Sequence, residues 1–361
     1  MITIIFGFAF LSIADLYYNT LNGNMLNDFF LIFFWWVLVC GLGTVFLPLT
    51  LRLFGKFFDR GYAFSKIIAI LVVSYLVWLW GSLKILPFTP QTIWLAIGLA
   101  AGANFYLFRK NQKEIKKEIK NNWKIFAFEE SLFFLALLFW AYIRGFQPNI
   151  QGLEKFMDYG FINSILRSRF FPPADMWLAG KTINYYYFGH LVTAVLTKLS
   201  GIDSAITYNL MIASLFAFCF TAAFCLGGNL VFTLTKKKKL VVLSGIFSAF
   251  LLNLGGNLHS LYWWLKNKNF STYWYPDATR FIVQKFGAAD NTIHEFPIYS
   301  SVVADLHGHF LNLPFVLLFL ALLLTTIFHR KITLPLCCLV ALLLGCFYMT
   351  NTWDFPIYFL V

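Results

Sequence analysis

Long apolar runs alternate with short polar segments along almost the whole chain. A helix that crosses the hydrocarbon core of a membrane needs about 20 predominantly apolar residues. Runs that approach this length cover about 2–18, 28–51, 67–86, 91–108, 125–146, 207–234, 240–258, 310–329 and 332–350. A run at about 186–199 is shorter, and a last one begins near Phe355 and stops with the chain at Val361. The pattern predicts an all-α, polytopic transmembrane helical bundle of about nine to ten spans, incomplete at its C-terminal end.

The composition supports a membrane protein. Hydrophobic residues make up 60% of the chain and charged residues 12%, against roughly 25% charged residues in soluble domains. The net charge of +12 would suggest nucleic acid in a soluble protein, but here Lys and Arg lie in short loops, so we expect no nucleic-acid partner. The six cysteines lie in or beside apolar runs without the spacing of metal ligands.

The basic residues predict the orientation of the bundle. They are concentrated at 52–66, 109–124, 236–239 and 330–331, and short basic segments stay on the cytoplasmic side. All four segments can share that side only if the run at 186–199 does not cross. We therefore expect that run to form a re-entrant or interfacial helix.

This orientation places the remaining polar segments together on the other side. The loops 147–185 and 259–306 and the turn 351–356 then face the exoplasmic compartment. We expect an integral, multi-pass protein of the plasma membrane, in contact with membrane lipids, whose functional face is exoplasmic.

The chain divides into three predicted parts. Residues 1–110 would form an N-terminal four-helix membrane bundle, and 125–361 a membrane core that is only partly present. Between them, 111–124 contains Ile115 and Ile119 and several Glu-to-Lys pairs. This segment reads equally well as an amphipathic helix on the cytoplasmic surface or as a solvated linker.

The first polar cluster follows the run at 125–146. Glu154 and Asp158 are four residues apart and would share one face of a helix. Asp158 is a candidate general base or metal ligand at the membrane surface. The alternative is a solvated acidic patch.

The second cluster is aromatic. Tyr185, Tyr186 and Tyr187 precede Phe188, Gly189 and His190 at the start of the short run. Consecutive aromatic residues favour the membrane interface, so an aromatic anchor is the simpler interpretation. His190, at the outer end of its helix, is a candidate for the site.

Two further clusters are polar. Glu295 precedes a segment in which Asp305, His307 and His309 alternate with other residues. A carboxylate with imidazoles suits a divalent metal or acid–base chemistry, and equally a structural hydrogen-bonded knot. Near the end, Trp353 and Asp354 would position a substrate; the alternative is that Asn351, Thr352 or Asp354 caps the next helix.

In combination, these motifs resemble a known family. The chain is similar over about 150–361 to the uncharacterised polytopic membrane family named for its triple-tyrosine (YYY) domain, found in archaea and some bacteria. The segments that carry the resemblance are Glu154–Asp158, Phe171–Gly180, Ile183–His190, Glu295–Pro297, Asp305–His309 and Asn351–Pro356. That family's pattern reads Gly-Asp-Leu-His-Pro-His, and this chain has Ala304 and Gly308 in place of its Gly and Pro.

The YYY family in turn looks like the C-type glycosyltransferases, which use sugars linked to lipid phosphate. The resemblance implies a glycosyltransferase-like core and a polyprenyl-phosphate-linked sugar donor. It implies Asp158 as the residue that deprotonates or orients the acceptor, with Asp305 and His307 also catalytic. Asp305, His307 and His309, or a metal held by them, would stabilise the phosphate leaving group. Residues implied in substrate binding are Glu154, Tyr186, Tyr187, His190, Glu295, Trp353 and Asp354.

Two other classes compete with an enzyme. A transporter or flippase of lipid-linked or polar substrates would carry mid-span charges and matching broken helices in two halves. No mid-span charge is evident in 207–258 or 310–350. A non-catalytic membrane assembly protein would use the same clusters as anchors and caps.

Overall fold

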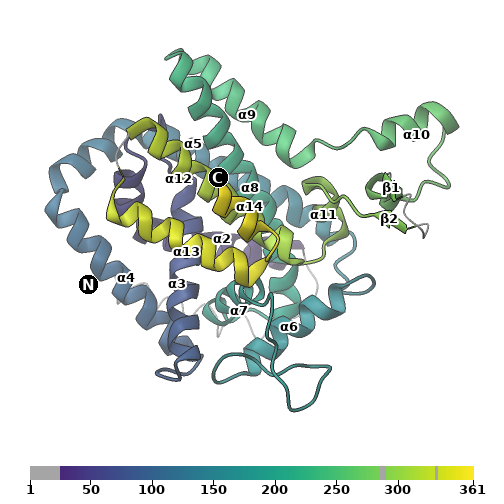
Figure 1. Cartoon of the computed structure of the whole chain (residues 1–361). Helices are drawn as coiled ribbons and strands as arrows, with labels where there is room; N and C mark the ends of the chain where they lie inside the picture. The colour runs from purple at the N-terminus through teal and green to yellow at the C-terminus, as the bar shows by residue number, and fades with distance from the viewer. Residues whose placement is uncertain (1–24, 281, 285–289, 330–331) are drawn as a thin grey trace.

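The computed structural model describes residues 25–280, 282–284, 290–329 and 332–361 (Figure 1). The predicted span at 2–18 lies outside these residues. The helices are α2 Met25–Leu53, α3 Phe64–Ser82, α4 Pro90–Lys110, α5 Gln112–Gly145, α6 Lys155–Arg167, α7 Phe188–Ser200, α8 Ser204–Leu234, α9 Lys238–Leu254, α10 His259–Asn267, the 3-10 helix η1 Tyr275–Thr279, α11 Pro297–Val303, α12 Gly308–His329, α13 Leu334–Thr350 and α14 Asp354–Leu360. Within the described ranges the only strands are β1 Ile282–Gln284 and β2 Asp290–Thr292, an antiparallel pair.

A helical membrane bundle is confirmed, but with fewer spans than predicted. Six described helices, α2, α3, α4, α5, α8 and α12, are long and apolar enough to cross a membrane. A seventh appears if α9 and α10 count as one span bent by 65°. The run at 332–350 forms α13, which has only 17 residues. The count of nine to ten is therefore not confirmed, because a hydropathy pattern does not show where a helix breaks or ends early.

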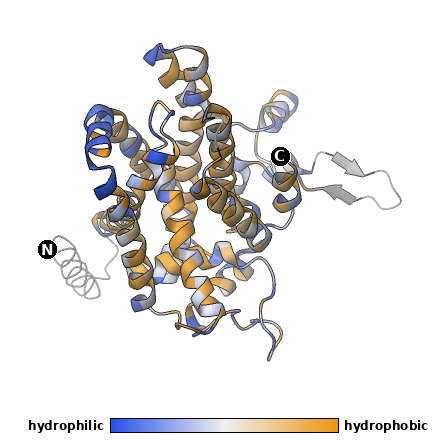
Figure 2. Cartoon of the chain, turned by 60° about the vertical axis from the view of Figure 1, so that its left-hand side comes forward, coloured by the Kyte–Doolittle hydropathy of each residue, from blue (hydrophilic) through white to orange (hydrophobic). Residues whose placement is uncertain are grey.

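Helix α8 forms the centre of the bundle, with 89% of its apolar window buried. It packs against α5, α9, α7 and α12. Small residues allow α9 to approach closely, since a Cβ added at Gly227 would lie 2.0 Å from Ser248 Oγ. Figure 2 shows hydrophobic residues along these central helices and hydrophilic ones mostly at helix ends.

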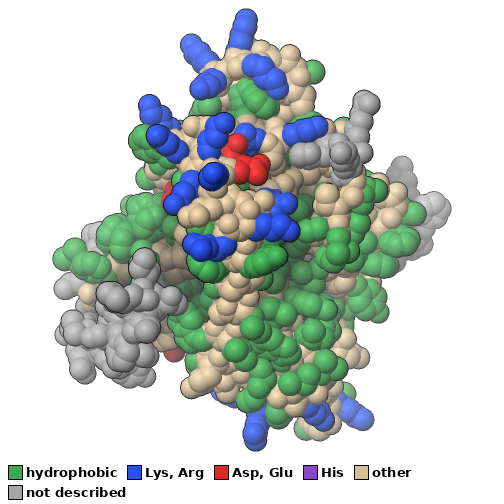
Figure 3. Space-filling view, turned by 90° about the vertical axis from the view of Figure 1, so that its left-hand side faces the viewer, with side chains coloured by type: hydrophobic (Ala, Val, Ile, Leu, Met, Phe, Trp, Pro, Cys, Tyr) green, Lys and Arg blue, Asp and Glu red, His purple; other side chains and the backbone are tan. Residues whose placement is uncertain are grey.

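The basic segments meet at one end of the bundle, here called the basic end. The backbone N–H of Phe58 donates to Asn229 Oδ1 at 2.8 Å, which joins the segment after α2 to the end of α8. Arg60 pairs with Glu118 near the start of α5 at 2.8 Å, and Lys56 reaches the carbonyl of Phe328 at the end of α12. Figure 3 shows Lys and Arg gathered over this end, above a broad hydrophobic surface.

The predicted linker at 111–124 is the first part of α5, which continues to Gly145. Its Ile115 is buried in a small cluster with Leu51 and Phe126. The segment is thus packed on the bundle, and the proposed three-part division stays a prediction.

The short run at 186–199 forms α7, which has 13 residues and reaches roughly 20 Å, less than the about 30 Å of a hydrocarbon core. It is buried among α3, α4, α6, α8, α12 and α13. At its end Lys198 donates to the carbonyl of Phe88, in the loop between α3 and α4, at 2.7 Å. Helix α7 therefore returns to the end of the bundle opposite the basic end, in agreement with a helix that does not cross.

Candidate functional site

Helices α6 and α7 are joined by a buried acid–imidazole pair. Asp158 Oδ1 lies 3.0 Å from His190 Nε2, and both side chains are fully buried. His190 Nδ1 donates to the carbonyl of Tyr186 at 3.2 Å. The Asp158–His190 contact therefore holds one shared proton, carried by either the imidazole or the carboxyl. The other carboxylate oxygen of Asp158 is buried and has no hydrogen-bond partner.

A second acid–imidazole pair lies at the surface. Glu154, at the N-cap of α6, accepts from His307 Nδ1 at 2.8 Å. His307 Nε2 lies 3.3 Å from the Tyr186 hydroxyl. The carboxylate fixes the tautomer, so Nε2 is the basic nitrogen and the phenol donates to it. Burial, with the nearby Asp158 and Glu154 charges, raises the pKa of Tyr186, which keeps the phenol protonated.

The third pair involves His309 and Glu295. His309 Nε2 lies 3.0 Å from Glu295 Oε2 and 3.0 Å from Ser300 Oγ, which itself donates to Glu295 at 2.8 Å. A nucleophilic triad needs serine and carboxylate on different imidazole nitrogens, so this triangle is not one. Burial alone would raise the pKa of Glu295, but the bond and charge of His309, with Ser300, lower it overall.

Asp305 lies between these groups. Its carboxylate is 3.6 Å from Lys155 Nζ and accepts from the backbone N–H of Glu154 at 3.5 Å. Burial raises the pKa of Asp305 to about 6, although Lys155 opposes the shift. A carboxyl with this pKa exchanges a proton near neutral pH, as acid–base chemistry requires.

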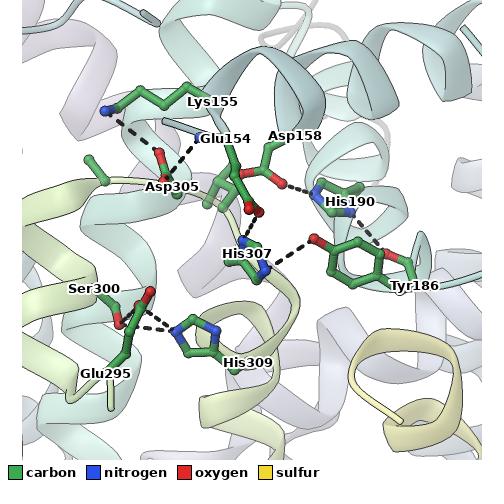
Figure 4. Close-up of polar contacts among 12 residues, drawn as sticks. Glu154, Lys155, Asp158, Tyr186, His190, Glu295, Ser300, Asp305, His307 and His309 are labelled. Carbon is green, nitrogen blue, oxygen red and sulfur yellow. Dashed lines mark hydrogen bonds and ion pairs between the residues drawn. The ribbon is translucent and has the colours of Figure 1, made fainter. Parts of the chain in front are cut away.

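Side chains of the last three groups, Glu154 with His307, Glu295 with His309, and Asp305, line one cavity of about 680 Å³, and Figure 4 shows these side chains and their polar contacts close together. Glu154, Glu295, Asp305, His307 and His309 form its polar wall. Arg280 adds a cation, and Leu153, Ile293, Tyr299 and Val303 complete the lining. The cavity has the size and mixed polarity of a small-molecule site.

The cavity gathers some of the predicted residues and leaves others aside. Asp158 and His190 are fully buried behind it. Tyr187 instead accepts from Trp78 Nε1 at 2.9 Å. Asp354 accepts from Asn312 and Asn351, at 2.6 and 3.0 Å, and Trp353 is exposed elsewhere. The contacts of Asp158, His190, Tyr187 and Asp354 are contacts within the protein. The catalytic role predicted for Asp158 and the substrate-binding roles predicted for the others therefore stay predictions.

The sequence reasoning missed several residues of the site. Lys155, Arg280 and Ser300 lie beside predicted residues or in the long outer loop, but nothing in their spacing marked them. Tyr208 was also missed: within α8, it bonds the carbonyl of Ala304 at 3.2 Å and the N–H of Leu306 at 3.3 Å. It thereby fixes the backbone on both sides of Asp305.

The predicted metal set does not converge. His307 and His309 have ring centroids 5.4 Å apart, but each pairs with a different carboxylate. Across the described part of the chain, no group of three or more His, Cys, Asp and Glu side chains could hold a metal ion. The metal stays a prediction.

Gly308 lies in close contact with the backbone of Thr350 and with the ring of Tyr186. Replacing Gly308 with Ala should disrupt this packing. An added Cβ would lie 2.4 Å from the Thr350 carbonyl oxygen and 2.5 Å from the Tyr186 ring. Since backbone stands in the way, we expect a loss of about 1–3 kcal/mol of unfolding free energy. Thermal unfolding measures it, and Gly345→Ala, which has open space, is the matched control. Equal unfolding free energies for Gly308→Ala and Gly345→Ala would contradict this packing.

Replacing Ala304 with Gly should increase the stability of the protein. It adopts φ 59° and ψ 37° at the C-cap of α11, a left-handed conformation that strains residues with a Cβ. Replacement by Gly, which the resemblance places here, should stabilise the protein by about 0.5–1 kcal/mol. A lower melting temperature would show that packing of the buried methyl group outweighs the strain.

The raised pKa of Asp305 predicts a pH-dependent stability. A carboxyl whose pKa rises from 3.8 to about 6 on folding favours the folded state when protonated and opposes it when ionised. Asp305→Asn should therefore raise the melting temperature above pH about 6, with the gain shrinking toward pH about 4. Thermal unfolding over a pH series checks this. A gain independent of pH, or a loss at high pH, would contradict it.

Fold and site together define a polytopic α-helical membrane protein with a polar cavity at the end opposite its basic loops. The chain belongs to the family described as Uncharacterized membrane protein (DUF2298), which matches residues 72–361. No curated protein and no solved structure matches it.

Proposed function

We propose that this protein is an integral membrane glycosyltransferase that transfers a sugar from a polyprenyl-phosphate-linked donor to an acceptor on the exoplasmic face of the plasma membrane. The observation that carries the proposal is the cavity lined by Glu154, Asp305 and His307. It lies at the end of a membrane bundle where a lipid-linked substrate can present its headgroup. The positive-inside rule assigns that end to the exoplasmic side.

His307 is the proposed general base. Glu154 holds its Nδ1–H, so Nε2 can take the proton of an acceptor hydroxyl in place of the Tyr186 contact. The acceptor oxygen bonds to the anomeric carbon while the bond from that carbon to the phosphate oxygen breaks. The electron pair leaves with polyprenyl phosphate. Asp305 lines the same cavity as His307, and burial raises its pKa to about 6, which suits a group that exchanges a proton during the transfer.

Cationic groups around the cavity supply the other requirement of such a transfer. Arg280 lines it, and Lys155 pairs with Asp305, which lines it as well. Positioned cations stabilise the charge that develops on a departing phosphate. In this proposal Asp158 does not contact the acceptor. Its pairing with His190 holds α6 against α7.

A transfer assay tests the proposal. The full chain in lipid nanodiscs would be given polyprenyl-phosphate donors carrying different labelled sugars, with release of polyprenyl phosphate as the readout. Release by the wild type, slower release by Glu154→Gln and the slowest release by His307→Ala is the expected result. Binding without release, or movement of intact donor between leaflets of proteoliposomes, would replace the enzyme with a transporter.

A further inference from the structure

The helix α10 lies outside the packed bundle and has no buried residue. Figure 1 shows α10 and the adjoining β-strands extending away from the other helices. The helix is separated from α9 by the four residues 255–258 and is bent by 65° from it. Its position calls for a partner other than the bundle itself.

The two sides of α10 differ. Tyr273 folds back onto one side, where its hydroxyl lies 2.9 Å from Ser260 Oγ and its ring 5.5 Å from that of Trp263. The other side presents Leu261, Trp264 and Leu265, spaced as neighbours on one helical face. These three side chains are each between 43% and 54% exposed. An aromatic and aliphatic face of this kind suits the boundary between lipid tails and headgroups.

Charge identifies the kind of surface. Lys266 and Lys268 are the only Lys or Arg residues in 255–276, and this segment contains no Asp or Glu. Lys268 Nζ lies 4.9 Å from the Trp264 ring centroid, at the edge of the exposed apolar face. Long basic side chains at such an edge reach the headgroups, and anionic lipids attract them.

The length of α9 indicates where α10 lies relative to the membrane. Its 17 residues reach roughly 25 Å, close to the about 30 Å of the hydrocarbon core. The helix begins at the basic end, so its last turn approaches the opposite surface of the membrane. A second helix turned through 65° there lies along that surface instead of crossing further.

We propose that α10 is an interfacial membrane-binding helix that inserts Leu261, Trp264 and Leu265 into the outer leaflet and binds anionic phospholipid headgroups through Lys266 and Lys268. The helix is tied to the cavity rim, since Asn257 donates to the carbonyl of Ala278 shortly before Arg280. A membrane-bound α10 therefore holds the cavity beside the lipid surface. This inference stands without the proposed enzymatic activity.

Spin labels at two neighbouring positions test the depth. Nitroxides would be attached at Leu265→Cys on the apolar face and at Asn267→Cys on the other, in the full chain with its six native cysteines replaced, in nanodiscs. Both residues are exposed, so neither label disturbs packing. The ratio of oxygen to aqueous nickel accessibility should be higher at 265 than at 267, because the apolar face lies in the acyl boundary and the other face in water. Two labels equally open to nickel, or both buried in oxygen-rich lipid, would overturn the proposal.

A second arm tests the lipid class. In nanodiscs of phosphatidylglycerol with phosphatidylcholine, K266Q/K268Q should shift the label at 265 toward water, because the attraction of both lysines to the anionic headgroups is lost. In phosphatidylcholine alone the same change should have little effect. An identical depth for both proteins in both lipids would overturn the anionic-headgroup assignment. Substituting Lys237 and Lys238, at the basic end, is the matched charge control.

Discussion

Replacing His307 with Ala should reduce sugar transfer by about 10²–10⁴-fold, the usual contribution of a positioned general base. Its imidazole is the one whose two nitrogens are divided between a carboxylate and a phenol at the cavity surface, at 2.8 and 3.3 Å. The loss should appear in kcat, because the proton transfer occurs in the transition state.

The protein should stay folded in this variant. The side chain of His307 is 33% exposed and that of Glu154 is 55% exposed, so their truncation leaves no deeply buried charge. Glu154→Gln should lower the rate less than His307→Ala, and the double variant should be no worse than His307→Ala alone. His329→Ala, at the other end of α12, is the matched control. Additive losses, or a stability loss that explains the rate, would contradict the assigned pair.

Replacing Asp158 with Ala should cost about 3–5 kcal/mol of unfolding free energy, as expected when one member of a buried polar pair is removed. His190 would then keep a ring nitrogen in a fully buried site with no acceptor. Because the pair joins α6 to α7, the loss should also lower the cooperativity of unfolding around the cavity. Thermal or denaturant unfolding in a mild detergent measures the effect.

Asp158→Asn separates this structural role from direct catalysis. The amide can still bond His190, so stability should recover most of the difference from the Ala variant, and transfer should fall only modestly. Asp28→Ala, at an exposed position in the first turn of α2, should change stability by less than about 0.5 kcal/mol. A stable Asn variant without any activity would instead support direct contact between Asp158 and the acceptor.

Charge distribution predicted much of the architecture. The positions of the basic segments required that the run at 186–199 should not cross, and α7 is indeed too short to span. The same reasoning placed Glu154, His190 and His307 at one end of the bundle, where the structure brings them together. Charge patterns succeed here because a membrane imposes one sidedness on every loop.

Sequence spacing could not decide which acidic residue faces the cavity. The i, i+4 rule put Glu154 and Asp158 on one helical face, but Glu154 is the N-cap, outside the regular helix. Its side chain turns to His307, while Asp158 points into the contact between α6 and α7. That choice depends on how two helices pack, which spacing within one helix does not contain. Arg280 was not predicted either, because a long loop brings it to the cavity. Local spacing within the sequence does not contain the path of such a loop.

The hydropathy pattern also did not predict the break between α9 and α10. A window over 240–258 averages across Gly255 and Gly256, where the helix ends and the chain turns. The run therefore looked like one span. The turn is a backbone event in the four residues 255–258, of which Leu258 has a φ of 60°, and an average of side-chain hydrophobicity does not register it.

The most direct test of the central claim is photolabelling with a polyprenyl-phosphate-linked sugar that carries a diazirine on the sugar ring. The full chain in nanodiscs would be labelled, digested and mapped by mass spectrometry, with unlabelled donor as competitor. The expected result is competed labelling on the peptides that contain Glu154, Arg280 and the Glu295–His309 segment. Labelling that unlabelled donor does not displace, or that falls only on the lipid-facing surfaces of α4, α5 and α9, would contradict it.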